Sequence, residues 1–157
     1  MNISSESIVS LSSIIVTGTM SRPKLNRKIS NPPLMVGYKP FGIPRRELSE
    51  LYLQFDEYEA IRLLDYLGMT QAQAAKMMNV SRPTLTRIYE KGRKTIAQAF
   101  VEGKMIMIEG GNVQFDGEWY RCRRCHRLVQ GLENHIQCKN CETSGDGELY
   151  PVNESVQ

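Results

Sequence analysis

The chain has 157 residues, of which 20 are Lys or Arg and 17 are Asp or Glu, so its formal net charge is +3. Its content of 41% hydrophobic and 24% charged residues excludes a fibre or a wholly disordered chain. No apolar run approaches the roughly 18 residues that a membrane-spanning helix needs. The most apolar stretch, 8–16, has no basic residue before it and no convincing signal-cleavage site after it. We therefore expect a small cytoplasmic protein with no membrane partner.

Charge is unevenly distributed along the chain. Residues 19–46 carry seven basic residues and no acid, whereas residues 47–65 carry a net charge of −5. Residues 81–94 and 121–127 each carry +4, and the charged residues of 142–157 are all acidic. Ordinary solvated surfaces mix the two signs, so three separate basic blocks favour a polyanionic partner.

The N-terminal third is predicted to contain no helix. Residues 1–19 are rich in Ser and contain no Lys or Arg, which predicts a flexible extension. Five of the seven prolines lie within 22–44, where they remove backbone donors and favour extended conformations. Residues 20–52 are therefore predicted to be an extended basic arm that leads into the next domain.

Two helices are predicted in the middle of the chain. Asp56 and Glu59 have the spacing of a capping box, and apolar residues follow at helical intervals until Gly68. A second capping box, formed by Thr70 and Gln73, predicts a short second helix directly afterwards.

A third, basic helix is predicted to begin after the N-cap residue Ser81 and to run to about Gly103, with Pro83 tolerated in its first turn. The turn before this helix contains Asn79, a residue that accepts a positive φ. Beyond the helix, the apolar run 105–108 is closed by two glycines and predicts a short strand or an apolar lid.

Two helices joined by a short turn, the second of them basic, are typical of a helix-turn-helix DNA-binding unit. The pattern requires small or apolar residues at six interior positions, and these are Ala74, Ala75, Met78, Val80, Leu85 and Ile88. Two ordinary amphipathic core helices would satisfy the same positions, so the outward face of the third helix distinguishes the two interpretations. That face is predicted to be basic and rich in hydroxyls, which suits bases and phosphates in the major groove. The predicted DNA-binding residues are Ser81, Arg82, Thr84, Thr86, Arg87, Lys91, Arg93 and Lys94.

All four cysteines lie in one pattern, Cys122-x2-Cys125 followed after twelve residues by Cys138-x2-Cys141. Two such turns supply four thiolates to a tetrahedral Zn²⁺ ion, which stabilises a module too small to fold alone. The pattern therefore predicts one structural zinc ion. Disulfides are the alternative, disfavoured without a secretory signal, and a rubredoxin-like iron site uses the same four ligands.

Basic residues outside the third helix are candidates for additional phosphate contacts, because Lys and Arg bind phosphate oxygens in any sequence context. The predicted contacts are Arg22, Lys24, Arg27, Lys28, Arg121, Arg123 and Arg124. His126 and His135 lie beside the cysteines, but neither is predicted to be a metal ligand because four cysteines already complete the site.

From Met20 onward the sequence resembles a known family. The segments MSRPKLNRKI, YKPFGIPRREL, FDEYEAIRLLDYLGMTQAQAAKMMNVSRPTLTRIYEKGRKTIAQAFVEGK and IEGG are similar to the predicted DNA-binding proteins of bacteria and archaea catalogued as domain of unknown function 134. The helix-turn-helix of that family is similar to region 4 of sigma-70 factors, which implies Arg82, Thr86 and Arg87 as base-contacting residues. Pro83 stands at a position that is commonly acidic in sigma factors, so their target sequence is not carried over.

These features together predict a mainly α protein with a helix-turn-helix domain, an extended basic N-terminal arm and a small C-terminal β zinc ribbon. The predicted divisions are a flexible extension at 1–19, a basic Pro-rich arm and lead-in at 20–52, a sigma-70 region 4-like helix-turn-helix domain at 53–111, a zinc-ribbon-like module at 112–144 and an acidic tail at 145–157.

The expected function is sequence-specific binding of double-stranded DNA by a transcriptional regulator. The alternatives are an adaptor that contacts RNA polymerase or another protein, and a rubredoxin-like electron-transfer protein. No phosphate-binding loop or nucleophile elbow occurs, and a closed four-cysteine site has no open coordination position, so we expect no enzyme. A homodimer would match DNA half-sites that repeat once per turn, although the sequence contains no zipper.

Overall fold

The structure is a computed structural model that describes residues 26–135 and 149–152. The predicted extension at 1–19 and four predicted site residues, Arg22, Lys24, Cys138 and Cys141, lie outside the described residues, as does most of the predicted acidic tail. The elements of the described part are β1 (Arg27–Ile29), β2 (Gly37–Tyr38), η1 (Arg45–Glu47), β3 (Glu50–Leu53), α1 (Phe55–Ile61), η2 (Arg62–Tyr66), α2 (Gln71–Met77), α3 (Arg82–Glu102), β4 (Met105–Ile108), β5 (Val113–Phe115), β6 (Trp119–Cys122), β7 (Leu128–Gln130), η3 (Leu132–His135) and β8 (Leu149–Pro151).

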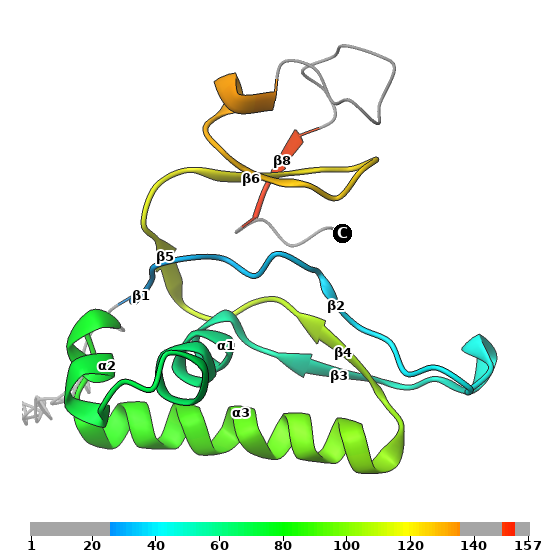
Figure 1. Ribbon diagram of the computed structural model, residues 1–157, viewed down its shortest axis with the longest axis horizontal. Helices are drawn as coiled ribbons and strands as arrows, with labels where there is room; N and C mark the ends of the chain where they lie inside the picture. The colour runs from blue at the N-terminus through cyan, green and yellow to red at the C-terminus, as the bar shows by residue number, and fades with distance from the viewer. Residues whose placement is uncertain (1–25, 136–148, 153–157) are drawn as a thin grey trace, which may run out of the picture.

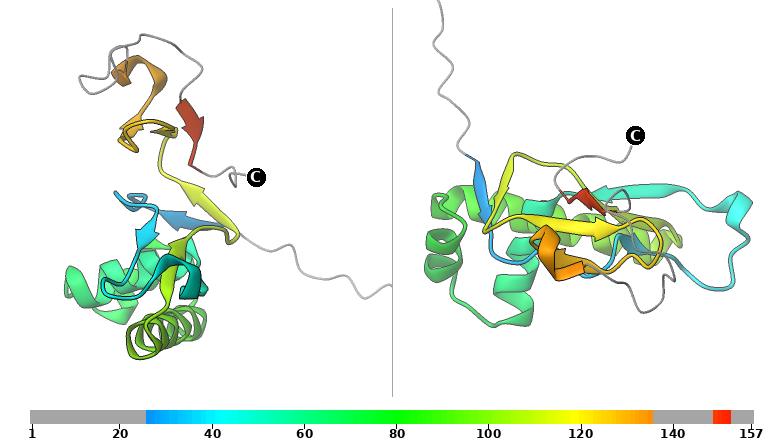
Figure 2. Two further views of the ribbon diagram at one scale, coloured as in Figure 1. Left: turned by 90° about the vertical axis from the view of Figure 1, so that its right-hand side faces the viewer. Right: turned by 90° about the horizontal axis from the view of Figure 1, so that it is seen from above.

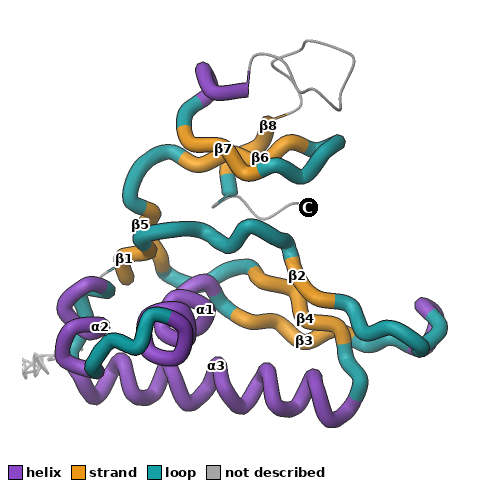
Figure 3. The backbone as a smooth tube through the Cα atoms, viewed as in Figure 1, coloured by secondary structure: helices purple, strands orange, loops and turns teal. Residues whose placement is uncertain are grey.

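The prediction of a mainly α protein is wrong. The described residues form three α-helices together with eight strands in three small sheets. Figure 3 shows α1, α2 and α3 together on the lower side of the molecule, with the three sheets above them. In Figure 1 and in the left view of Figure 2, α3 forms one edge, the sheet of β6, β7 and β8 forms the opposite edge, and the other strands lie between them.

The described part of the predicted basic arm, residues 26–52, contributes strands to the folded sheets. β1 pairs in parallel with β5, and β2 and β3 pair with the two sides of β4. The four prolines of this region that the structure describes lie between the strands, where a missing backbone donor interrupts no ladder. Strands of two to four residues show too little alternation for a sequence pattern to reveal them, so the proline content dominated the prediction.

The predicted second and third helices are present with their predicted ends. The Thr70 hydroxyl accepts the backbone N–H of Gln73 at 3.3 Å, and Ser81 caps α3 in the same way. Asn79 has a φ of 54°, and Gly103 ends α3 with a φ of 65°. The apolar run 105–108 forms β4, the central strand of its sheet.

The first helix begins earlier than the capping-box spacing predicted. α1 starts at Phe55, and Glu57 rather than Glu59 reaches back to the N-cap, where its carboxylate accepts the backbone N–H of Gln54 at 3.1 Å. Asp56 and Glu59, the predicted capping pair, are instead buried in the interior. A π-helical turn, η2, continues the helix towards Gly68.

Two apolar clusters make up the core beneath α3. One joins α1, α2 and the N-terminal half of α3 through side chains that include Leu63, Met78 and Leu85, all completely buried. The other joins β1, β3, β4 and the start of α1 through Ile29, Leu53, Phe55 and Ile108. All six interior positions predicted for the helix-turn-helix pattern belong to the first cluster or pack against it.

The buried side of α1 carries three carboxylates. Asp56 accepts a hydrogen bond from Arg27 of β1 at 2.5 Å, and Glu59 accepts two from Arg62 at 2.8 Å. Glu57 lies 2.5 Å from the ammonium of Lys91 on α3. The part of the acidic block 47–65 that lies on α1 is therefore buried. Each of its carboxylates has a cationic partner, as buried charges require.

α1 and α3 cross closely at Gly92. A Cβ atom at this position would lie 3.0 Å from both the Cβ of Glu57 and the Cδ1 of Ile61. The absence of a side chain there allows α1 to approach α3 and brings Glu57 within reach of Lys91.

We expect Gly92→Ala to lower the free energy of unfolding by about 1 to 2 kcal/mol, because overpacking outweighs the gain in helix propensity of about 1 kcal/mol. Urea denaturation of the purified chain measures this change. Ala97→Ser, an exposed substitution on α3, is the control. A Gly92→Ala chain more stable than wild type would contradict the close crossing.

Candidate nucleic-acid interface and metal site

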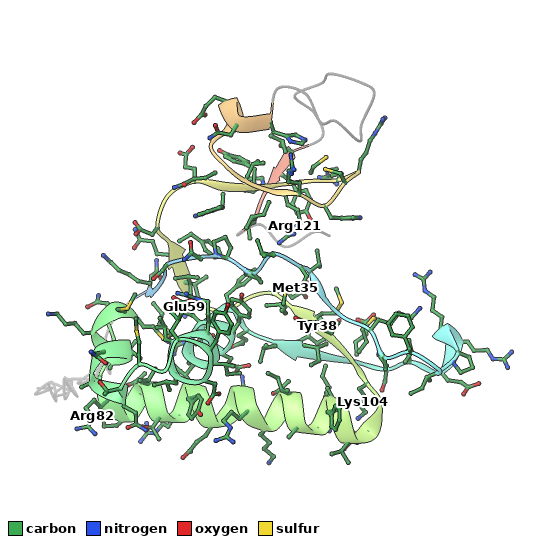
Figure 4. All side chains as sticks on the ribbon, in the orientation of Figure 1. Met35, Tyr38, Glu59, Arg82, Lys104 and Arg121 are labelled. Carbon is green, nitrogen blue, oxygen red and sulfur yellow. The ribbon has the colours of Figure 1, made fainter. Side chains whose placement is uncertain are left out.

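The outward face of α3 presents the predicted DNA-contacting side chains to solvent. Arg82, Arg87, Arg93 and Lys94 are exposed, whereas Leu85 and Ile88 face the core. Figure 4 shows Arg82 at one end of α3, on the side away from the sheets. Within residues 26–135 and 149–152, the side chains of Arg82, Arg87 and Lys94 form no ion pair. Their charges are therefore available to a partner.

The hydroxyl groups at the start of α3 are engaged within the helix. The hydroxyls of Ser81 and Thr84 lie 2.8 Å apart, and Ser81 also caps the helix. Thr86 donates its hydroxyl proton to the carbonyl of Arg82 at 3.1 Å. Each oxygen keeps acceptor capacity, but Ser81 and Thr84 have a structural role that the sequence pattern assigned only to Ser81.

Two of the predicted basic residues on α3 have partners. Lys91 pairs with the buried carboxylate of Glu57 while its own side chain remains 62% exposed. The guanidinium of Arg93 lies 5.4 Å from the ring centroid of Tyr89, a cation–π distance. A substitution of Lys91 would therefore change stability as well as surface charge, because it would leave Glu57 without a cation.

Lys28 of the predicted arm contacts the turn that precedes α3. Its backbone N–H donates to the carbonyl of Met78 in the turn between α2 and α3, at 3.1 Å, and its side chain is exposed. Arg27 points inward and pairs with Asp56, so its charge is largely compensated. β1 therefore places one available cation, on Lys28, beside the turn that precedes α3.

A second cluster, at the end of β6, has the composition of a metal site. The ligand atoms of Cys122, Cys125 and His135 lie within 4.8 Å of one another. Burial raises the pKa of the Cys122 thiol, but backbone N–H groups of Cys125 and Arg124, with the side chains of His135 and Cys125, lower it to about 6. A thiolate is the form that binds metals, so these three side chains can hold a metal ion.

His135 belongs to this cluster, although it was not predicted to be a metal ligand because four cysteines already complete a tetrahedral site. η3 folds back and brings the imidazole beside Cys122. A nearby histidine in the sequence was the available signal, but its distance from the cysteines depends on the path of the chain after β7.

Arg121 occupies a different place from the one expected of a phosphate contact. It is only 4% exposed, and its guanidinium donates to the carbonyls of Leu34 at 2.8 Å, His126 at 2.9 Å and Pro33 at 2.7 Å. Figure 4 shows this side chain directed from the β6 sheet towards the strand region below. Arg121 thus fastens the cysteine-bearing sheet to the segment between β1 and β2.

The basic residues at 123–127 and the outward face of α3 lie at opposite edges of the molecule (Figures 1 and 2). Arg123 and Arg124 are exposed on the hairpin between β6 and β7, and Arg123 also packs over the ring of Tyr150 at 5.2 Å. A straight DNA duplex lying along α3 would not meet this hairpin in the same protomer.

Comparison with known proteins shows to which protein family the chain belongs. The family model described as "Protein of unknown function DUF134" matches residues 17–116. The chain is 44% identical over 132 residues to a UPF0251 protein of Moorella thermoacetica, covering 82% of this chain and 89% of the relative. It is 42% identical over 135 residues to one of Halothermothrix orenii, covering 82% of this chain and all of the relative. The chain belongs to this family, as the resemblance of its sequence predicted.

No solved structure matches the chain. Of the helices in the described ranges 26–135 and 149–152, none has the length and apolar character needed to cross a bilayer.

We expect Arg121→Met to loosen the attachment of the cysteine-bearing sheet, because it removes three charge-assisted hydrogen bonds and leaves the buried carbonyl of Pro33 unpaired. The expected loss is about 2 to 4 kcal/mol. Amide hydrogen exchange measures it as faster exchange in β6 and β7. Arg127→Met, at an exposed position of the same hairpin, is the control. Equal exchange in both variants would show that Arg121 does not hold the sheet.

Proposed function

We propose that this protein is a sequence-specific binder of double-stranded DNA and acts as a transcriptional regulator. The observation that carries the proposal is the outward face of α3, on which Arg82, Arg87 and Lys94 project without an intramolecular ion pair among the described residues. The helix follows α2 through a turn with a left-handed Asn79, which is the arrangement of helix-turn-helix proteins. In this proposal α3 enters the major groove.

Different residues of α3 take different roles in the proposed complex. Arg82 and Arg87 lie in the N-terminal half of α3, the part that approaches base edges in helix-turn-helix complexes. Arg can bond bidentately to guanine. Lys94 lies two turns further along, where it would meet a phosphate. Lys28, beside the turn, supplies a second phosphate contact.

The cysteine cluster serves a structural role in this proposal. Cys122, Cys125 and two ligands outside the described residues, Cys138 and Cys141, would bind one Zn²⁺ ion. His135 would then donate a hydrogen bond to a thiolate instead of binding the metal. When bound, zinc would crosslink the two halves of the C-terminal module and contribute folding free energy.

Arg87→Ala is expected to weaken binding to the preferred duplex by about 1 to 3 kcal/mol and to relax the preference at one base pair. Lys94→Ala is expected to weaken binding to all duplexes alike and to reduce the slope of log K against log salt by about 1. Duplexes selected from a random library, followed by titration at several salt concentrations, measure both effects.

The control for this experiment is Arg127→Ala, which removes an exposed arginine at the opposite edge of the molecule. It should bind as wild type does. If neither α3 variant differs from wild type on any duplex, α3 does not contact DNA. If wild type binds selected and scrambled duplexes equally, the binding is not sequence-specific.

Elemental analysis of the purified chain is expected to give about one zinc ion per chain. Cys125→Ser should reduce this content strongly, because it removes a ligand. His135→Ala should keep the metal if the four cysteines are the ligands. Loss of metal in His135→Ala would instead make the histidine a ligand, and iron in place of zinc would contradict the zinc assignment.

A further inference from the structure

An apolar pocket lies between the β2–β4–β3 sheet, α1 and the C-terminal half of α3. Its volume is about 560 Å³, within the range of binding pockets in proteins. Most of its wall is made of aliphatic and aromatic side chains, among them Leu53, Ile96, Phe100, Ile106 and Ile108. Tyr38, Met35 and Lys104, labelled in Figure 4, come from the strand side and from the end of α3.

A residue that lines this pocket is followed in the sequence by an aromatic residue whose side chain is completely exposed. Pro40 lines the pocket, and the side chain of the next residue, Phe41, is completely exposed to solvent. The loop that carries Phe41 packs closely against the end of α3, because a Cβ at Gly103 would lie only 2.6 Å from the Cδ1 of Ile43. Phe41 is therefore presented to solvent by a loop that packs against the end of α3.

Other large apolar side chains on the same end of the molecule are also uncovered. Phe100 is 88% exposed and Val101 is 81% exposed, both in the last turns of α3. Tyr38 on β2 is 61% exposed. An exposed apolar surface beside an apolar pocket is characteristic of a protein interface.

We propose that the pocket is filled by Phe41 of a second copy of this chain, in a two-fold symmetric exchange. In a two-fold dimer, a residue of one copy contacts a site on the other, and the same contact is repeated in reverse. A projecting aromatic and a receiving pocket that lie side by side satisfy this condition with a single axis between them. Each Phe41 enters the pocket of its partner, and Phe100 and Val101 are covered along the seam.

A second copy of the chain would cover more of the exposed apolar surface around the pocket than a small ligand would. A small apolar molecule could fill the pocket, but it would leave Phe41 in water. Burial of a Phe side chain is favourable because it removes apolar surface from water, and the symmetric exchange buries two of them. The exchange therefore removes the pocket and the exposed aromatic residues from water together.

This dimer would also place the two α3 helices suitably for DNA, a step that rests on the proposed function. Arg87 and Gly103 are sixteen residues apart, or about 24 Å along the helix. Two helices that meet near their C-terminal ends can bring their outward faces to half-sites about 34 Å apart if they are inclined to each other.

Sedimentation equilibrium of the full chain, with zinc, reductant and no DNA, tests the dimer separately from DNA binding. Wild type is expected to have the mass of two chains at micromolar concentrations. Phe41→Asp is expected to weaken dimerisation at least ~30-fold, as loss of a central aromatic contact does. Tyr66→Asp, at an exposed aromatic on η2 outside the pocket lining, is the matched control and should dimerise as wild type does.

A photo-crosslinking amino acid at position 41 identifies the receiving surface. In a mixture of ¹⁴N-labelled and ¹⁵N-labelled chains, the crosslink is expected to join position 41 of one chain to residues 96–108 of the other. Circular dichroism of Phe41→Asp should match that of wild type, because the side chain is exposed. Three results would overturn the proposal: a monomeric wild type, equal dimerisation of Phe41→Asp and Tyr66→Asp, or crosslinks within one chain only.

Discussion

The carboxylates of Asp56, Glu57 and Glu59 are all buried on one short helix, and each needs a cationic partner from a particular direction. Arg27 comes from β1, Lys91 from α3, and Arg62 from η2, the π-helical turn that continues α1. Glu59 also accepts the backbone N–H of Ser30 at 3.2 Å. Unpaired charges in this position would cost several kcal/mol each, so β1, α1 and α3 have one favourable arrangement relative to one another.

Because these carboxylates and their partners pair inside the protein, the net charge of the sequence does not describe the charge that the surface presents. Much of the negative block at 47–65 does not oppose the basic residues of α3 at the surface, because its α1 carboxylates face inward and are compensated there. Lys91 and Arg27 pair with buried carboxylates. Within the described residues, Arg82, Arg87 and Lys94 form no ion pair, so their charges remain available at the surface. Among the described residues, the basic blocks of the sequence thus contain two cations that pair with buried carboxylates, an exposed face on α3, exposed residues of the arm such as Lys28, and a distant hairpin beside the cysteines.

The second and third helices and their ends were predictable because local signals specify them: Thr70 and Ser81 as N-caps, Asn79 in the turn and Gly103 at the end of α3. The strands β1, β2 and β3 were not predictable, because they are short and pair with partners more than fifty residues away. The hydrogen bonds of Arg121 to the segment between β1 and β2 and the pairing of Lys91 with Glu57 were also not predicted. Each depends on which segment lies beside it in space, and residue type together with sequence spacing cannot supply that information.

The pairing of β1 with β5 has a consequence for synthesis of the chain. The first described strand cannot complete its ladder until Val113–Phe115 has left the ribosome, and β3 must wait in the same way for β4. The three helices emerge between these partners and can form first from local contacts. The family match ends at residue 116, directly after β5 closes the first ladder. The end of the family match therefore coincides with the shortest nascent chain in which every strand from β1 to β5 has its neighbour.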